Sequence, residues 1–291
     1  MGDGKTGMLR CSSIGSSPLA GICSSQRARV FYMQVSDFDG YFALHEKGAY
    51  REAYALLQDI IKSQPQWSKV GDLYVWCADL ELTLNDDLRK AGEFLDKAIE
   101  LGCASMAPYY RVRGYVLWRN GDHENGLRHL EKSVELDPSV TNLATFGKLL
   151  SSDHDKRALW VWQRVLQKDP DNCMAHIYLG IDAAAAGDRA KAFLMAKRAE
   201  KLSRSGQDVS EIGHLYEELG EFQIALDTYL KADRLGDEPK GILYASMATC
   251  YFALGDERTG RKFADWALRC NPENDYVKRI WQQSQGKSDQ R

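Results

Sequence analysis

The stretch YFALGDERTGRKFADWALRCNP, residues 251–272, repeats the punctuation of LWRNGDHENGLRHLEKSVELDP, residues 117–138. Both stretches contain Gly-Asp at the same place, a second Gly five residues after the first, a small residue (Ser133 or Ala267) and a closing Pro. A pattern that returns with the same spacing indicates a repeated structural unit rather than a catalytic motif. The sequence therefore predicts an array of similar units.

Glycines and prolines set the period of this array. Gly48, Gly121, Gly187, Gly220 and Gly255 are separated by 73, 66, 33 and 35 residues, which is one or two copies of a unit of about 34 residues, the period of a stacked helix-turn-helix array. Because proline ends helices, the six prolines near the expected junctions support the same division. These prolines are Pro65, Pro108, Pro138, Pro170, Pro239 and Pro272. The units are expected near 34–67, 70–103, 107–138, 140–170, 173–205, 207–239 and 241–272.

One unit shows how two helices arise from this pattern. In SEIGHLYEELGEFQIALDTYLKADRLG, residues 210–236, Ile212 and Tyr216 lie on one helical face and Gly220 breaks the chain. Ala225 and Tyr229 then begin a second apolar stripe with helical spacing. A single hairpin of this kind cannot bury its apolar face alone, so we expect neighbouring hairpins to stack.

At these residues the chain resembles the tetratricopeptide repeat family. The matching positions are Ile212-Gly213 with Tyr216, Ala225 and Tyr229; Leu179-Gly180 with Ala192 and Ala199; Tyr244, Ala248, Tyr251, Ala267 and Pro272; and Tyr110, Gly114, Leu117 and Pro138. The resemblance implies an all-α fold, an α-solenoid of about seven stacked helical hairpins over residues 34–272. Two departures are an expected insertion around Asn85-Asp86-Asp87 and the run Ser151-Ser152-Asp153-His154-Asp155, which replaces the usual glycine turn.

The two ends of the chain differ from the array. ENDYVKRIWQQSQ, residues 273–285, has one apolar side and predicts a C-terminal capping helix; residues 286–291 are expected to be a disordered tail. Residues 1–33 are rich in Gly and Ser and are expected to be a disordered segment. Arg10, Arg27 and Arg29 among serines leave an organellar transit peptide as an alternative, and Met33 could equally be the natural start.

Composition predicts a foldable, cytoplasmic protein. The chain has 291 residues, 44% of them hydrophobic, and a formal net charge of −3, so no global attraction to nucleic acid is expected. Its seven cysteines are scattered and never spaced as C-x-x-C, which argues against a disulfide framework and a zinc site. No run approaches the about 20 apolar residues that span a bilayer.

No set of residues predicts an active site. The sequence contains no H-E-x-x-H motif, no G-x-S-x-G elbow and no Gly-rich loop between a strand and a helix. The group Asp153-His154-Asp155 falls in an expected solvated turn, and His176 falls on an expected helix as a packing residue. We therefore expect no catalysis, no metal and no cofactor.

The family resemblance implies a binding groove lined by the first helix of each unit. The positions that would face a ligand are Tyr74, Val75, Arg111, Val112, Tyr115, Trp118, Arg119, Thr145, Lys148, Ile177, Tyr178 and Ile181. Aromatic and arginine side chains there favour a protein or peptide ligand with apolar anchors and acidic residues. Arg111 and Arg119, as surface residues, are expected to tolerate charge reversal without loss of stability. The alternative is that Tyr115 and Trp118 pack between units and the arginines are only solvated.

One branch of the family grips the acidic tails of heat-shock chaperones with a set of Lys, Asn and Arg residues. This chain has Arg111, Tyr115, Thr145, Met174 and Tyr178 at the corresponding positions. The chaperone carboxylate clamp is therefore not expected.

The sequence thus predicts a non-catalytic scaffold or adaptor that binds a protein partner; it sets no oligomeric state. The alternative is an RNA-processing-associated adaptor, because RALWVWQRVLQKDP, residues 157–170, resembles the half-a-tetratricopeptide units of such factors. Trp160, Trp162 and Arg164 could stack on unpaired bases. Trp162 also occupies the place of the second-helix aromatic, and core packing is favoured there.

Overall fold

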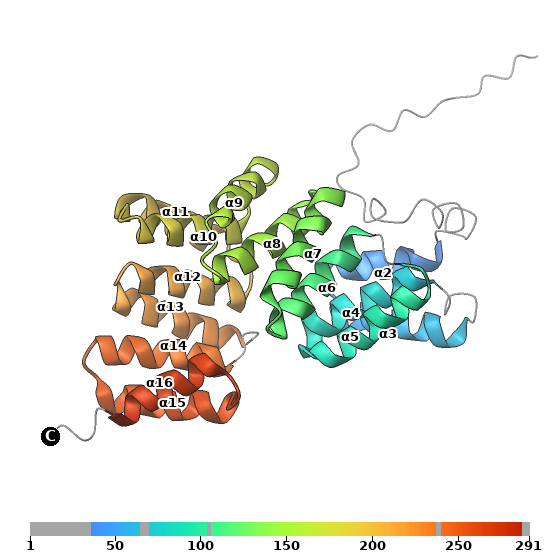
Figure 1. Ribbon diagram of the computed structural model, residues 1–291. Coiled ribbons are helices and arrows are strands. Elements are labelled where there is room, and N and C mark those ends of the chain that lie inside the picture. The colour runs from blue at the N-terminus through green and yellow to red at the C-terminus, as the bar shows by residue number, and fades with distance from the viewer. Residues whose placement is uncertain (1–35, 65–69, 104–105, 237–239, 287–291) are drawn as a thin grey trace, which may run out of the picture. The chain divides into compact units, whose positions relative to one another are not determined.

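The computed structural model describes residues 36–64, 70–103, 106–236 and 240–286, and within these ranges all regular structure is helical (Figure 1). The helices are α2 (Ser36–Glu46), α3 (Tyr50–Ser63), α4 (Gly71–Asn85), α5 (Leu88–Glu100), α6 (Ala107–Arg119), α7 (His123–Leu136), α8 (Val140–Ser152), α9 (Arg157–Lys168), α10 (Cys173–Ala185), α11 (Arg189–Leu202), α12 (Gly206–Glu218), α13 (Phe222–Leu235), α14 (Lys240–Ala253), α15 (Glu257–Cys270) and α16 (Asp275–Gly286). The predicted all-α solenoid of seven hairpins with a capping helix is confirmed. The prediction for residues 1–33 lies outside the described residues, and so does the predicted tail 286–291 except for Gly286, which is the last residue of α16.

The repeated Gly-Asp pair forms the turn inside a hairpin. Gly121 and Gly255 have φ angles of 89° and 85°, in the left-handed region that glycine adopts without steric cost. The aspartate that follows caps the second helix: the Asp122 carboxylate accepts from the Asn125 N–H, and the Asp256 carboxylate accepts from the Thr259 N–H. The pair therefore ends one helix and begins the next.

The second glycine of the repeated stretch lets the two helices of a hairpin touch. A Cβ on Gly126 would lie 2.8 Å from the Cβ of Trp118, and a Cβ on Gly260 would lie 2.5 Å from a ring carbon of Phe252. The small residue further along is fully buried in both copies, and the Ser133 hydroxyl donates to the carbonyl of Ala107 at 2.7 Å. These contacts explain why the same spacing of Gly, Asp and small residues occurs in residues 117–138 and again in residues 251–272.

The chain divides into two compact units, residues 1–149 and 150–291, and α8 spans the boundary. In the N-terminal unit, α4 pairs with α5 and α6 pairs with α7, while the first helices α4 and α6 also contact each other. The core between these hairpins includes Val75, Leu95 and Val112. The first helices therefore form one layer and the second helices another.

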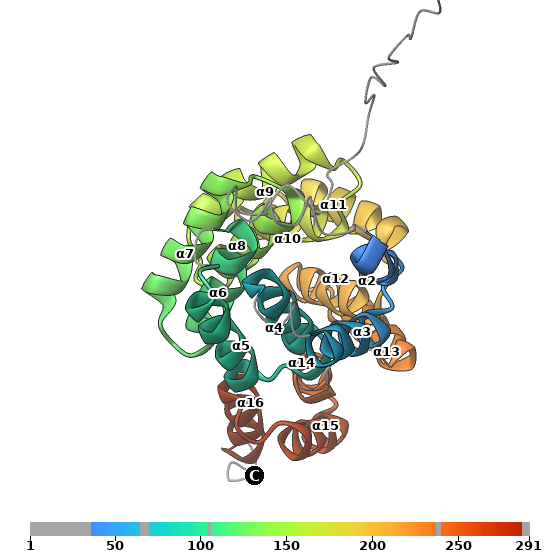
Figure 2. The same ribbon diagram turned by 90° about the vertical axis from the view of Figure 1, so that its right-hand side faces the viewer.

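The C-terminal unit has the same two layers. Its first helices α10, α12 and α14 contact one another in series, and α11 and α13 each pack against the first helix of the following hairpin. The last helix, α16, lies beside α15 in both views and also contacts α14 (Figures 1 and 2). The Trp281 indole donates to the Asp265 carboxylate at 2.8 Å. The end of the array is thereby covered.

The two sequence departures have simple structural outcomes. Helix α4 continues to Asn85, Asp86 takes a left-handed conformation with φ 51°, and Asp87 caps α5. This hairpin has the same length as that of α6 and α7, so the expected insertion is wrong. In the turn after α8, His154 takes the place of glycine with φ 54°.

Candidate functional site

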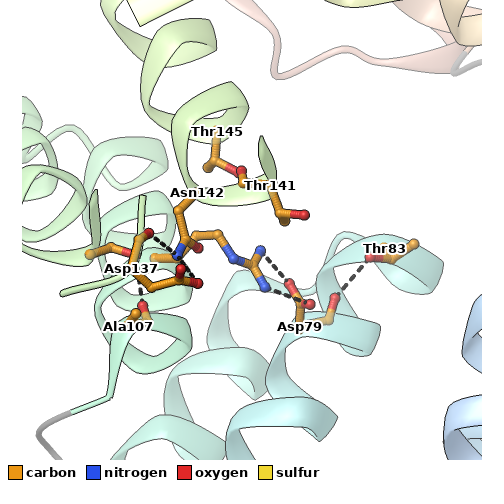
Figure 3. Close-up of polar contacts among 9 residues, drawn as sticks. Asp79, Thr83, Ala107, Asp137, Thr141, Asn142 and Thr145 are labelled. Carbon is orange, nitrogen blue, oxygen red and sulfur yellow. Dashed lines mark hydrogen bonds and ion pairs between the residues drawn. The ribbon is translucent and has the colours of Figure 1, made fainter. Parts of the chain in front are cut away.

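The first-helix face of the N-terminal unit is built around an ion pair between neighbouring repeats. Both terminal nitrogens of Arg111 on α6 donate to the carboxylate of Asp79 on α4, at 2.9 and 2.8 Å (Figure 3). The side chains keep 16% and 30% of their surface exposed. One turn further along α4, the Thr83 hydroxyl donates to the Asp79 carbonyl. The pair therefore lies at the surface between two first helices and fixes both side chains.

A second arginine on the same helix makes a matching pair. Arg119 donates from both terminal nitrogens to Asp86, at 3.0 and 2.9 Å, and also donates to the Tyr115 hydroxyl at 2.8 Å. Its guanidinium carbon lies 5.6 Å from the centre of the Tyr115 ring, within the range of a cation–π contact. Asp86 keeps 59% of its side chain exposed. The result is a pre-paired polar group beside an aromatic ring.

These pairs cancel the positive charge expected for this face. Burial works against ionisation of Asp79, but the charge and hydrogen bonds of Arg111 outweigh it and hold the pKa of this carboxyl below its usual range. Hydrogen bonding to Asp86 raises the pKa of Arg119 above its usual value. Each of the two arginines is thus matched by one aspartate, so the two pairs together add no net charge to this face.

The adjoining part of α8 adds neutral polar groups. The Asn142 side-chain amide donates to the carbonyl and carboxylate of Asp137, at 2.8 and 3.2 Å, which fixes the start of the helix. The Thr145 hydroxyl donates to the Thr141 carbonyl, and both residues are visible on this helix in Figure 3. Lys148 lies half-buried on the following turn.

Two of the predicted aromatic site residues pack inside their own hairpins. Tyr74 lies half-buried, with its ring centre 6.4 Å from that of Phe94 on α5. Trp118 stacks on His123 of α7 at 4.6 Å. The structure thus brings Arg111, Tyr115 and Arg119 onto one face, whereas Tyr74 and Trp118 pack inside their own hairpins and not between units.

In the C-terminal unit the predicted positions do not form one open surface. Ile177 has no exposed surface and belongs to the core, so its predicted contact with a ligand is wrong. Tyr178 stacks on Trp162 with ring centres 4.8 Å apart and planes within 5°, and Ile181 packs partly buried against the core. Successive residues on a helix are about 100° apart, so a register one residue off moves a side chain from the surface into the core.

The burial of Trp162 argues against its stacking on RNA bases, as the RNA-associated alternative would require. Its side chain is 1% exposed, and its indole donates to the Ser151 hydroxyl at 3.0 Å. The ring is therefore core packing, as the sequence analysis favoured. Of the two tryptophans in that stretch, Trp160 alone is exposed.

The acidic partners Asp79 and Asp86 were missed by the sequence analysis. Arg111 lies 32 residues after Asp79, and Arg119 lies 33 residues after Asp86. These separations match the repeat period, so the partners occupy nearly equivalent positions in consecutive units. An acid one period before an arginine is the sequence signal that could have predicted both pairs.

The buried carboxylate of Glu81 links α4 to the helices on either side of it in the sequence, α3 and α5. Glu81 on α4 has 2% of its side chain exposed; it pairs with Lys90 at 2.8 Å and accepts hydrogen bonds from Tyr54 and from Asn85. Burial raises the pKa of a carboxyl, but the hydrogen bonds from Lys90, Tyr54 and Asn85 outweigh burial and hold the pKa of Glu81 below its usual range. The network joins α3, α4 and α5 and stabilises this part of the unit.

His176 is a packing residue, and the described residues form no cluster suited to a metal ion. His176 is 9% exposed and lies between the carbonyl of Pro170 and the sulfur of Met195, which confirms its predicted packing role. Among the described residues, no group of three or more His, Cys, Asp or Glu side chains could hold a metal ion. Within the same ranges, no helix is both long and apolar enough to cross a membrane.

Comparisons with known proteins agree with this architecture. A sequence model described as tetratricopeptide repeat matches residues 107–140, which includes α6 and α7. The chain is 25% identical over 221 residues to the tetratricopeptide repeat-containing protein trd-1 of Caenorhabditis elegans, an alignment that covers 72% of this chain and 27% of that protein. The chain therefore spans about a quarter of the length of this relative.

Solved structures show the same fold at low sequence identity. The hetero-tetramer of Cut9 and Hcn1 from the APC/C matches 90% of this chain and 51% of the other chain, with a TM-score of 0.65 and 14% identity. A tetratricopeptide repeat protein from Parabacteroides merdae matches 86% of this chain and 98% of its own, with a TM-score of 0.60 and 14% identity. The hairpin repeats, the sequence match over α6 and α7 and these relatives agree: residues 107–140 match the tetratricopeptide repeat, and the chain has the fold of tetratricopeptide repeat proteins.

Proposed function

We propose that this chain is a non-catalytic scaffold or adaptor that binds a partner protein on the first-helix face of its N-terminal unit. Proteins built from tetratricopeptide repeats generally mediate protein–protein interactions, and their fold is typically a scaffold without catalytic activity. The observation that carries the proposal is the row of paired side chains across α4 and α6, where Asp86, Tyr115 and Arg119 stay accessible.

The pairing supports binding because the side chains are already fixed. Ordering a long, mobile side chain on binding costs about 0.5–1.5 kcal/mol, and a preformed ion pair avoids most of this cost. The Tyr115 ring offers a large contact area, and the exposed carboxylate of Asp86 still has acceptor capacity after its bonds to Arg119.

The same pairing changes the expected ligand. Because Asp79 and Asp86 balance Arg111 and Arg119, an acidic ligand gains little from net charge at this face. A segment with an apolar side chain for Tyr115 and hydrogen-bonding groups for Asp86 and Arg119 fits better. We therefore propose a ligand that is apolar and neutral polar in place of the acidic ligand first expected.

A matched pair of arginine variants tests this assignment. Arg119 and Arg113 both lie on α6 and both pair with one aspartate, but Arg113 pairs with Asp96 on α5, away from Tyr115. Peptides are selected from a display library on the immobilised wild-type chain, and their affinities for each variant are measured by fluorescence anisotropy. We expect Arg119→Ala and Tyr115→Ala to weaken binding at least about tenfold, as for central interface residues. Arg113→Ala should bind as the wild type does, and equal affinities for all three variants would refute the assignment.

A further inference from the structure

Charges are sorted between the two helix layers of the C-terminal unit. The second helices α9, α11, α13 and α15 together contain 14 Lys and Arg and 5 Asp and Glu. The first helices α10, α12 and α14 contain 1 Lys, no Arg and 5 Asp and Glu. In the N-terminal unit, by contrast, the second helices α3, α5 and α7 contain 7 Lys and Arg and 8 Asp and Glu. A strongly basic layer is therefore specific to one unit of a chain whose net charge is −3.

Most of these positive charges are not neutralised inside the protein. Five of the 14 side chains form ion pairs, as Arg189 does with Glu221 and Arg198 with Asp171. The other nine form no ion pair with any described residue. They are Arg164, Lys168, Lys191, Lys201, Lys231, Arg234, Arg258, Lys262 and Arg269. All nine except the half-buried Arg164 are exposed, and we call this exposed side of the second helices the basic face.

Each of the four helices also exposes a large apolar side chain. The exposed fractions are 56% for Trp160 on α9, 67% for Leu194 on α11, 54% for Leu235 on α13 and 45% for Trp266 on α15. One helical turn away, each has a cation without an ion pair among the described residues: Arg164 follows Trp160, and Lys191, Lys231 and Lys262 precede Leu194, Leu235 and Trp266. An apolar anchor beside a cation thus recurs on successive hairpins.

The Trp266 side chain is held by neighbouring aromatic rings. The Trp266 ring makes an edge contact with Phe263 at 5.0 Å and lies 6.1 Å from the ring of Tyr244. Between α11 and α13 lies a hollow of about 250 Å³ with an apolar wall of Val209, Ile212 and Ile224 and a polar rim of Glu200, Ser203, Asp227, Thr228 and Lys231. The surface therefore combines fixed apolar contacts with a recess that can accept an apolar side chain.

We propose that the basic face binds an acidic protein segment that carries apolar side chains. Unpaired Lys and Arg attract the acidic residues and speed the encounter, while Leu194, Trp266 and the hollow bury the apolar ones. Base stacking by a nucleic acid requires aromatic rings with a free face. The Trp160 ring is covered by Arg164 at 4.6 Å, and the Trp266 ring makes an edge contact with Phe263. An aliphatic side chain such as Leu194 gains nothing from a phosphate backbone. This face shares no residue with the site proposed on α4 and α6.

Two triple variants with the same charge change test the proposal. Lys191→Glu, Lys262→Glu and Arg269→Glu together reverse the basic face. Lys47→Glu, Arg51→Glu and Lys62→Glu reverse three exposed cations of the N-terminal unit as the control. The probes are a fluorescein-labelled helical peptide with Glu and Leu on opposite faces, the same peptide with Ser at every Leu, and a single-stranded oligouridine of equal charge. Circular dichroism melts confirm that each variant is folded.

The proposal predicts a specific set of affinities. The basic-face variant should bind the Glu/Leu peptide at least about tenfold more weakly than the wild type, and the control variant should change by less than about twofold. Leu194→Ser should weaken the Glu/Leu peptide but not the Glu/Ser peptide. Equal losses in the two triple variants would show that only net charge matters and would overturn the proposal. Oligouridine binding as tight as that of the Glu/Leu peptide would also overturn it, in favour of a nucleic-acid ligand.

Discussion

Arg111 of α6 and Asp79 of α4 form a two-pronged ion pair, at 2.9 and 2.8 Å, that joins the first helices of two consecutive repeats. Arg111 is therefore not a solvated surface residue, and the expectation that its charge can be reversed without loss of stability does not fit its partly buried place. The same pair ties the proposed binding face to the stability of the N-terminal unit.

Breaking this pair should destabilise the protein. Removing one partner of a fully buried pair costs about 3–5 kcal/mol; because both side chains retain some exposure, we expect Arg111→Ala to lower the free energy of unfolding by about 2 kcal/mol. Asp79→Ala and the double variant complete a double-mutant cycle, measured by urea unfolding. The double variant should lose less than the sum of the single variants. If the losses of the two single variants add up to that of the double variant, the interaction between Arg111 and Asp79 contributes nothing to the free energy of unfolding.

The contact between α6 and α7 predicts opposite effects for two glycine substitutions. A Cβ on Gly114 would lie 2.8 Å from the carbonyl oxygen of Gly126 and 2.9 Å from the Cγ of Leu130. Gly114→Ala should therefore force the helices apart and destabilise the unit by about 1–3 kcal/mol. Gly92 on α5 has no atom within 4 Å of the same position, so Gly92→Ala should raise stability by up to about 1 kcal/mol. Thermal melts of the two variants give the comparison, and equal shifts would contradict the packing described.

Tyr229 should be a strong determinant of stability in the C-terminal unit. Its side chain is 1% exposed, its ring fills the space over Gly213, and its hydroxyl donates to Glu217 at 2.8 Å. Tyr229→Ala should cost on the order of 3 kcal/mol in the free energy of unfolding. Tyr229→Phe keeps the ring and loses only the hydrogen bond, so about 1 kcal/mol is expected. If the two variants melted alike, the ring could not be the main contribution.

Glu81 predicts a defined pH dependence. Its pKa in the folded protein lies below the ordinary value of 4.5, so the folded state favours the ionised form more than the unfolded state does. The stabilisation is fully present above pH 4.5 and is lost as the pH falls through the lower, folded-state pKa. Glu81→Gln should therefore reduce stability at neutral pH and flatten its decline in acid.

The control for this prediction is Glu93→Gln. Glu93 lies 61% exposed on α5 in an ion pair with Arg89, and surface pairs of this kind contribute about 0–1 kcal/mol. Denaturant midpoints measured from pH 7 down to pH 3 should separate the two variants. Parallel curves for Glu81→Gln and the wild type would exclude the network as the source of acid sensitivity.

The fold could be predicted from the sequence because its determinants are local. Gly121 and Gly255 need a left-handed backbone, Asp122 and Asp256 cap the next helix, and each glycine five residues on permits a close helix contact. These requirements recur with the period of the hairpin, so one sequence is enough to reveal them.

The binding face was harder to predict because its contacts cross from one repeat to the next. Asp79 and Asp86 neutralise arginines one period later, and neither aspartate stands out in a composition or a motif. Ile177 was expected at the surface but lies in the core. The turn residues define where a helix begins only to within one residue, and a shift of one residue changes which side chains face the core. The charge difference between helix layers needs the helix bounds before it can be counted.

Site-specific cross-linking shows whether a ligand lies on the first-helix face of the N-terminal unit. Position 115 or, as the control, position 113 of α6 is replaced by p-benzoylphenylalanine, and each protein is irradiated with a peptide selected on the wild-type chain. Tyr115 lies beside Arg119 on the first-helix face, whereas Arg113 pairs with Asp96 on α5. We expect a covalent adduct from position 115 and none from position 113. Adducts from position 113 alone, or equal yields from both, would contradict binding on the first-helix face.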